Sequence, residues 1–279
     1  VSACGPGVVR LGGALSGKTV QELRQFVLSE LEDAKASQAA NGGERLAKVL
    51  APALGSPADA GPLGHPCPTA PAARWDLRLP LSPVVRRALR ELLGGDAPLG
   101  GALEIAAGGR EAELWELAAL VSAPGAASQI VHADADSPGL LHTAFVALQR
   151  VSHDLGPTIF LPGTHADVKA HAALEAMGDV TGLQAAPDSP PPPSYASLLM
   201  SGDASLYDGR LLHCGGANTF EQSAQEMGIS ARDGFRVLFY VTFRHADQPE
   251  AWDPARSILA RYDGRLKLGM LRDTVAAAL

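Results

Sequence analysis

The sequence predicts a mainly β protein, an antiparallel sandwich or barrel with helices added to it. Two observations support this fold class. From residue 102 onward, short apolar runs alternate with turn residues, a texture typical of antiparallel sheets. Before that point, amphipathic stretches predict helices. We expect one domain over residues 1–279, with a helical N-terminal addition (1–100), a β core (101–248) and a C-terminal extension (249–279).

Three stretches predict helices. In residues 18–36, after the potential capping residue Ser16, apolar side chains recur at helical spacing: Val20, Leu23, Phe26, Val27 and Leu31. Residues 82–94 predict a second helix that stops at two glycines. Residues 165–177 predict a helix inserted between strands. Residues 52–73 and 187–194, rich in proline, glycine or alanine, predict irregular loops.

Nine apolar runs are expected to form the strands of the β core. They are ALEIAAG, ELWELAALVS, SQIVHAD, LLHTAFVALQRV, TIFLPG, YASLLM, ASLYDG, RLLHCG and FRVLFYVTFRH. Trp75 and the leucines of the earlier segment RWDLRLPL either seal one sheet or line a substrate opening, and the sealing role is the expected one because large apolar side chains are usually buried.

Composition excludes several classes of function. The 23 basic and 30 acidic residues give a net charge of −7 without a basic block, so nucleic acid is not an expected partner. No apolar run approaches the roughly 20 residues that span a bilayer. The 3 cysteines lack the spacing of a disulfide framework or zinc site, which favours a reducing compartment, cytoplasmic or organellar. The chain begins at Val1, which leaves open whether a targeting segment precedes it.

The stretch QIVHADADSPG (residues 129–139) places an imidazole and a carboxylate on one face of a strand. His132 and Asp134 are two positions apart, so they point the same way while their neighbours point the other. His213, near a later strand end, is a plausible third donor. Two imidazoles and one carboxylate form the facial triad that binds non-haem Fe(II) and leaves coordination positions open. The alternative is a buried, hydrogen-bonded His–Asp pair.

The segments that follow resemble a known family. GPTIFLPGTH (156–165), SGDASLYDGRLLHCGGAN (201–218) and FRVLFY (235–240) come after the H-x-D pair in that order, and together they resemble the phytanoyl-CoA dioxygenase family. The resemblance implies a double-stranded β-helix, a cupin-like jelly-roll barrel, as the core. It also implies an Fe(II)- and 2-oxoglutarate-dependent oxygenase that consumes O₂, releases succinate and CO₂, and hydroxylates its substrate.

The resemblance assigns roles to four residues. His132 and Asp134 match the family's H-x-D motif, and His213 matches its distal metal-binding histidine. Arg236 matches the arginine that binds the far carboxylate of 2-oxoglutarate, a contact that a planar guanidinium makes bidentately. The spacing from His213 to Arg236 is longer than the family usually shows, and Arg232 is a rival. Arg236 is preferred because a lone charge in an apolar strand needs a buried anionic partner.

Weaker expectations concern the residues around this set. Gln129 lies where family members present a side chain near the co-substrate, although a surface amide is an alternative. Thr143 could offer its hydroxyl to a carboxylate of the co-substrate, or could simply be a residue that favours a strand. Gly215, Gly216 and Asn218 are expected to shape the turn after His213. Cys214 should point to the opposite face and belong to the core.

The substrate is expected to be a small organic or lipid-like molecule. Asp134 favours a hydroxylase, or a desaturating or cyclising oxygenase, over a halogenase, because halogenating relatives lack this carboxylate. A CoA ester stays open, since residues 244–272 hold nearly balanced charges. Two other classes remain: a cupin-like metalloenzyme that does not use 2-oxoglutarate, and a non-catalytic jelly-roll binding protein. Arg236 distinguishes the first alternative, which has no use for it. The oligomeric state does not follow from the sequence.

Overall fold

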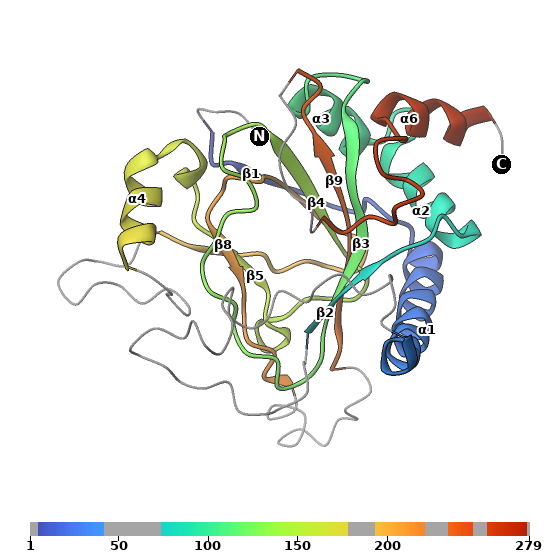
Figure 1. The fold of residues 1–279 in the computed structure, drawn as a ribbon, viewed down its shortest axis with the longest axis horizontal. Helices are drawn as coiled ribbons and strands as arrows, with labels where there is room; N and C mark the ends of the chain where they lie inside the picture. Colours follow the sequence, from blue (N-terminus) through green and yellow to red (C-terminus); the bar gives the residue numbers. More distant parts are fainter. Residues whose placement is uncertain (1–4, 42–73, 178–192, 221–233, 248–255, 278–279) are drawn as a thin grey trace.

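The computed structural model describes residues 5–41, 74–177, 193–220, 234–247 and 256–277. Two antiparallel sheets face each other, and helices cover the outer side of the larger sheet (Figure 1). The predicted mainly β fold class, a cupin-like jelly roll, is confirmed. Loop residues 52–73 and 187–192, and Arg232, lie outside the described residues.

The larger sheet has the strand order β1-β7-β4-β9-β3-β2. Its strands are β1 (Val8–Leu11), β7 (Ala204–Asp208), β4 (Leu141–Ala147), β9 (Arg236–Arg244), β3 (Glu113–Ser122) and β2 (Arg74–Arg78). The smaller sheet has the order β6-β5-β8, with strands β6 (Tyr195–Ala196), β5 (Thr158–Phe160) and β8 (His213–Gly215).

Side-chain alternation divides the larger sheet into two buried faces. The outer face packs against α1 (Gly17–Asn41), α2 (Pro83–Leu93), α3 (Pro98–Ala106) and α6 (Leu268–Ala277), in one apolar cluster. The inner face packs toward the smaller sheet, where Phe160 of β5 and Tyr207 of β7 have ring centroids 5.0 Å apart. Trp75 packs on the helical side, under the Lys35 ammonium group, so it seals the sheet as expected.

The three predicted helices are present. Ser16 Oγ accepts a hydrogen bond from the Thr19 backbone N–H (3.4 Å) at the start of α1. In α2, Ser82 Oγ does the same for Val85 N–H (3.4 Å). The inserted helix α4 (Val168–Met177) follows the short 3₁₀ helices η1 (His153–Leu155) and η2 (Thr164–Ala166).

Three expectations about the elements need correction. ALEIAAG is not a strand: it lies in and just after α3, where Pro98 occupies the first turn and Leu99 and Leu103 bury one helical face. SQIVHAD makes isolated bridges rather than a regular strand, including one between His132 and His213. The first hundred residues are not purely helical, because β1 and β2 belong to the larger sheet.

The C-terminal part of the chain packs along β3. The backbone N–H of Leu117 donates to Ser257 O (3.0 Å), and that of Leu114 donates to Leu266 O (2.8 Å). Among the described residues, no helix is both long and apolar enough to cross a bilayer.

Candidate metal centre

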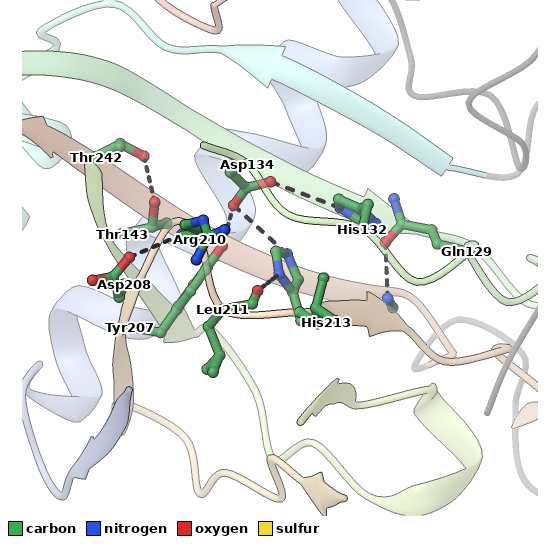
Figure 2. Close-up of polar contacts among 12 residues, drawn as sticks. Gln129, His132, Asp134, Thr143, Tyr207, Asp208, Arg210, Leu211, His213 and Thr242 are labelled. Atoms are coloured by element: carbon green, nitrogen blue, oxygen red, sulfur yellow. Dashed lines mark hydrogen bonds and ion pairs between the residues drawn. The ribbon is translucent and has the colours of Figure 1, made fainter. Parts of the chain in front are cut away.

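Three side chains converge between the two sheets. The ligand atoms of His132, Asp134 and His213 all lie within 4.8 Å of one another (Figure 2). Asp134 Oδ1 is 3.7 Å from His132 Nε2, and Asp134 Oδ2 is 3.6 Å from His213 Nε2. Donors about 2.1 Å from a shared ion can be up to about 4.2 Å apart, so an ion can bridge Asp134 and either histidine at these separations. The structure therefore brings together the three residues that the sequence predicts.

Backbone pairing sets the positions of the donors. His132 and His213 exchange two backbone hydrogen bonds, each 2.9 Å long, although they are 81 positions apart. The Asp134 N–H donates to Gly209 O (2.7 Å) in the turn after β7. Backbone hydrogen bonds of the barrel therefore hold together the segments that carry the three residues.

Both imidazoles present Nε2 to the centre. His132 Nδ1 lies 2.9 Å from Ile130 O, and His213 Nδ1 lies 2.9 Å from Leu211 O. A carbonyl oxygen can only accept, so each Nδ1 must bear a proton, and Nε2 is the ring nitrogen that can bind an ion. Burial, followed by the neighbouring His213, lowers the pKa of His132 to about 4, which keeps its ring neutral. Neutral, oriented imidazoles suit a transition metal.

Tyr207 positions the carboxylate. Its hydroxyl donates to Asp134 Oδ2 at 2.9 Å, and the tyrosine is fully buried on the inner face (Figure 2). Burial, together with the charge of Asp134, raises the pKa of Tyr207, so the hydroxyl keeps its proton and donates. Two histidines and one oriented carboxylate form the donor set that non-haem Fe(II) takes, with coordination positions left for other ligands.

Gly215 and Gln129 lie beside the histidines. Gln129 is buried, and its Oε1 accepts from the Gly215 N–H at 2.9 Å, so it is not a surface amide. A Cβ atom on Gly215 would lie 2.5 Å from Gln129 Oε1 and 2.8 Å from Arg74 Nη1. Glycine is therefore required for the close packing of these side chains. Asn218 holds the following turn through Nδ2, which donates to Ser122 O (3.1 Å) and Gly234 O (2.7 Å).

Arg236 begins β9 and is fully buried on the inner face. Its Nη2 donates to Ser122 Oγ at 3.0 Å, and its Nη1 donates to Gly156 O. Burial, followed by the charge of Arg74, lowers the pKa of Arg236. The expectation of a charge buried in an apolar strand is correct. Among the described residues, its partners are uncharged.

Thr143 does not lie beside Arg236, so of its two expected roles the geometry favours that of a strand residue. Its Oγ1 is 3.0 Å from Thr242 Oγ1, and the two threonines are opposite each other in the β4–β9 register. Thr242 is six positions from Arg236 along β9, about 20 Å at 3.4 Å per residue. Thr143 therefore lies too far from Arg236 to share a carboxylate with it. Cys214, as expected, faces the other way and packs with Val131 and Leu212.

Sequence reasoning missed two side chains of this region, Arg74 and Tyr207. Alternation in RWDLR could have identified the first, because Trp75 and Leu77 face the helices and therefore Arg74 and Asp76 face inward. Tyr207 is one of several aromatic residues in strands, and no local signal indicates that its hydroxyl reaches Asp134.

Comparisons with known proteins agree with this geometry. The family model described as phytanoyl-CoA dioxygenase matches residues 4–225. A search of curated proteins finds no match. Among solved structures, AviO1 from Streptomyces viridochromogenes Tue57 is 16% identical with a TM-score of 0.53, over 89% of this chain and 94% of AviO1.

Two further structures come from nogalamycin biosynthesis. The non-heme alpha ketoglutarate dependent epimerase SnoN is 21% identical, with a TM-score of 0.51 over 90% of this chain and 89% of SnoN. The carbocyclase SnoK is 17% identical, with a TM-score of 0.52 over 90% of this chain and 88% of SnoK. A second SnoN structure, with a TM-score of 0.50, contains Fe3+, alpha ketoglutarate and nogalamycin RO. These likenesses show a shared fold.

Proposed function

Because the chain belongs to the phytanoyl-CoA dioxygenase family, we propose that it is an Fe(II)- and 2-oxoglutarate-dependent oxygenase that oxidises a C–H bond of a small organic molecule. The observation that supports this most directly is the convergence of His132, Asp134 and His213. The buried Arg236 supports the use of 2-oxoglutarate in particular, because a cupin-like metalloenzyme without that co-substrate has no use for it.

Each residue of the set has a physical role in the proposed reaction. Iron, when bound by the three residues, supplies the reduction of O₂ with 2-oxoglutarate as electron donor, and succinate and CO₂ are released. Ile130 O and Leu211 O hold the two imidazoles in orientation. Tyr207 holds Asp134. Arg236 orients the co-substrate by its distal carboxylate, and the full burial of Arg236 keeps bulk water away from that contact.

Hydroxylation is the outcome that we propose, with stereochemical inversion or ring closure as the second candidate. Asp134 leaves no vacant position for a halide, which argues against halogenation. The relatives SnoN and SnoK, described as an epimerase and a carbocyclase, support the second candidate. Mass spectrometry of the product distinguishes the outcomes: hydroxylation adds an oxygen atom, epimerisation leaves the mass unchanged, and cyclisation removes two hydrogen atoms.

The substrate that we propose does not have the phosphates of a CoA ester. A CoA ester needs a basic cleft, and most basic residues of the C-terminal part are already paired with carboxylates. The pairs are Arg244 with Glu113 (2.6 Å), Arg256 with Glu113 (3.4 Å), Lys267 with Glu111 (2.5 Å) and Arg272 with Glu104 (3.1 Å). This pairing supports a substrate without multiple negative charges.

The test is an anaerobic titration of the metal-free protein with Fe(II) and then with 2-oxoglutarate. The expected result is the visible charge-transfer band of a keto acid chelated to ferrous iron. Iron binding without the band would favour the cupin-like metalloenzyme. Absence of both would favour a non-catalytic binding protein, in which the His–Asp pair is structural.

A further inference from the structure

A row of hydroxyl groups leads away from the metal centre across the inner face of the larger sheet. Tyr207 of β7 is opposite Thr143 of β4, and Thr143 is opposite Thr242 of β9. Tyr207 donates to Asp134 Oδ2 at 2.9 Å (Figure 2). The hydroxyls of Thr143 and Thr242 are 3.0 Å apart, and Thr242 Oγ1 is 2.6 Å from Glu116 Oε2. Side chains of adjacent strands therefore form one connected row from Asp134 to Glu116.

The hydroxyls of this row are removed from water. Tyr207 and Thr242 are 0% exposed and Thr143 is 3% exposed. A buried hydroxyl needs its hydrogen-bond partners inside the protein, because an unpaired one costs free energy. Each member of the row therefore depends on its neighbours, and the state of one group determines what the next can donate.

The number of protons determines the direction of the row, because a hydroxyl group has one proton to donate. Tyr207 uses its proton on Asp134. Burial raises the pKa of Tyr207, and a side-chain hydrogen bond from Thr143 acts in the opposite direction. Thr143 then has no proton left for Thr242, so Thr242 must donate to Thr143 and has none left for Glu116.

Glu116 can supply the proton that this direction requires. Its Oε1 accepts from the Ser257 N–H (3.3 Å), so a carboxyl proton belongs on Oε2, which faces Thr242. Burial raises the pKa of Glu116 to about 8, and the charges of Asp76 and Asp134 act in the same direction, so Glu116 holds its proton near neutral pH. Every proton of the row then points toward the metal-binding carboxylate.

We propose that the row from Glu116 to Thr143 positions the metal-binding carboxylate by fixing the hydrogen bond that Tyr207 donates. This inference rests on the proposed function, because it concerns the same metal centre. In a directed row each hydrogen bond polarises the next, so the row strengthens the contact that orients Asp134. Glu116 acts from a distance, as the donor at the far end.

The experiment measures the dissociation constant of Fe(II) anaerobically near neutral pH, without a co-substrate, by competition with a chelator. Thr143→Val keeps the shape of the side chain but interrupts the row. We expect the dissociation constant to rise about two- to tenfold, as for loss of one net hydrogen bond. Thr143→Ser keeps the hydroxyl and should restore the affinity. Thr242→Val interrupts the row one strand further on and provides the same test if Thr143→Val does not fold.

A double variant shows whether the row acts through Tyr207. In that case Thr143→Val should add nothing to the loss that Tyr207→Phe causes alone, since the contact that the row supports is already absent. Glu116→Gln places an amide N–H where the acid has its O–H and should retain most of the affinity.

The matched control is Ser205→Ala. Ser205 lies on the same strand as Tyr207 and shares a buried hydrogen bond with Ser197 (2.7 Å), outside the row. Its replacement removes a buried hydroxyl from β7 and should leave the dissociation constant of Fe(II) unchanged. Circular dichroism checks that each variant folds.

The outcomes separate this inference from the proposed function. Wild-type affinity in Thr143→Val, equal losses in Thr143→Val and Ser205→Ala, or full additivity with Tyr207→Phe would each overturn the role of the row while the metal centre stands. If the wild-type protein binds no Fe(II), the proposed function fails and this inference fails with it.

Discussion

At one end of the inner face, Arg74 and Arg236 have free donors, whereas a few strand positions away Asp76 and Glu116 are satisfied by the protein itself. Asp76 accepts from the Tyr240 hydroxyl (2.9 Å) and from Ser257 Oγ. Glu116 contacts Thr242 Oγ1 (2.6 Å) and accepts from the Ser257 N–H (3.3 Å). Burial raises the pKa of Asp76 to about 6 and that of Glu116 to about 8, so Glu116 is largely protonated near neutral pH whereas Asp76 is largely ionised.

The difference between the two ends shows which buried polar groups point to a ligand. The acidic group forms a closed network with hydroxyls of the same sheet and with the C-terminal segment, so it accounts for its own burial. The cationic group has donors that the described protein atoms leave free. This difference supports the proposed binding of the co-substrate at Arg236 and a structural role for the acids.

The largest effect is expected at the metal centre. Asp134→Ala removes one of three donors and should abolish Fe(II) binding at concentrations that saturate the wild type, while the fold remains. Iron content after dialysis measures this. The control is Asp136→Ala, an exposed carboxylate two positions later, which should bind iron normally. Retained iron in Asp134→Ala would contradict the donor assignment.

The second largest effect is expected on 2-oxoglutarate binding when Arg236 is replaced. Arg236→Ala should weaken 2-oxoglutarate binding by about 30-fold or more, equivalent to about 2 kcal/mol, because a buried contact to a carboxylate is lost. Fe(II) affinity should remain unchanged. Titration of the charge-transfer band measures the first quantity and iron titration the second. Full co-substrate affinity in this variant would show that the arginines serve the fold alone.

A smaller effect, on metal affinity, is expected at Tyr207, whose hydroxyl contacts the carboxylate of Asp134. Tyr207→Phe removes the hydrogen bond to Asp134 Oδ2 but keeps the ring packed against Phe145 and Phe160. Loss of such a supporting contact typically lowers metal affinity by about 10–100-fold. Competition with a chelator measures this. A metal affinity equal to that of the wild type would mean that backbone pairing alone orients Asp134.

The smallest effect concerns the acidic end and its pH dependence. The folded pKa of Glu116, about 8, exceeds its ordinary value of 4.5, so the folded state holds the proton more tightly than the unfolded chain. Its stabilising contribution is therefore complete below about pH 4.5 and is lost as the pH rises through about 8.

Glu116→Gln removes this pH-dependent loss. Between about pH 5 and pH 8, the free energy of unfolding of the metal-free variant should fall by about 1–2 kcal/mol less than that of the wild type. One unit of pKa shift corresponds to about 1.4 kcal/mol. The expected effect is smaller than the full shift implies because Glu116 keeps some solvent contact. Urea unfolding at several pH values measures it. Parallel curves for the two proteins would show that Glu116 is ionised in the folded state.

Local patterns were sufficient to predict most strands and the common direction of His132 and Asp134, whereas the assignment of the three metal donors also needed the resemblance to the family. ELWELAALVS coincides with β3, and the alternation of His132 and Asp134 gives their common direction without knowledge of the rest of the fold. His213 was within reach because it precedes a glycine turn at a strand end. These features depend on a few consecutive residues.

Features that depend on strand pairing could not be predicted. Arg74 meets Arg236 only because β2 and β9 flank β3 in a particular register. Leu114 faces the helices although Glu116, two residues later, faces inward, because the β3–β9 register shifts between them, and the local sequence does not reveal this shift. Thr143 was misplaced for the same reason: its distance from Arg236 follows from the β4–β9 register.

The reciprocal backbone bonds between His132 and His213 also bear on how the protein handles metal loss. They close an 81-residue loop through backbone atoms alone, so we expect the conformational entropy of bringing the two imidazoles together to be lost during folding and not during metal capture. Metal binding then requires little further ordering of the chain, whereas small domains that fold only around their ion become ordered when the metal binds. The protein should withstand repeated chelation and reloading without unfolding.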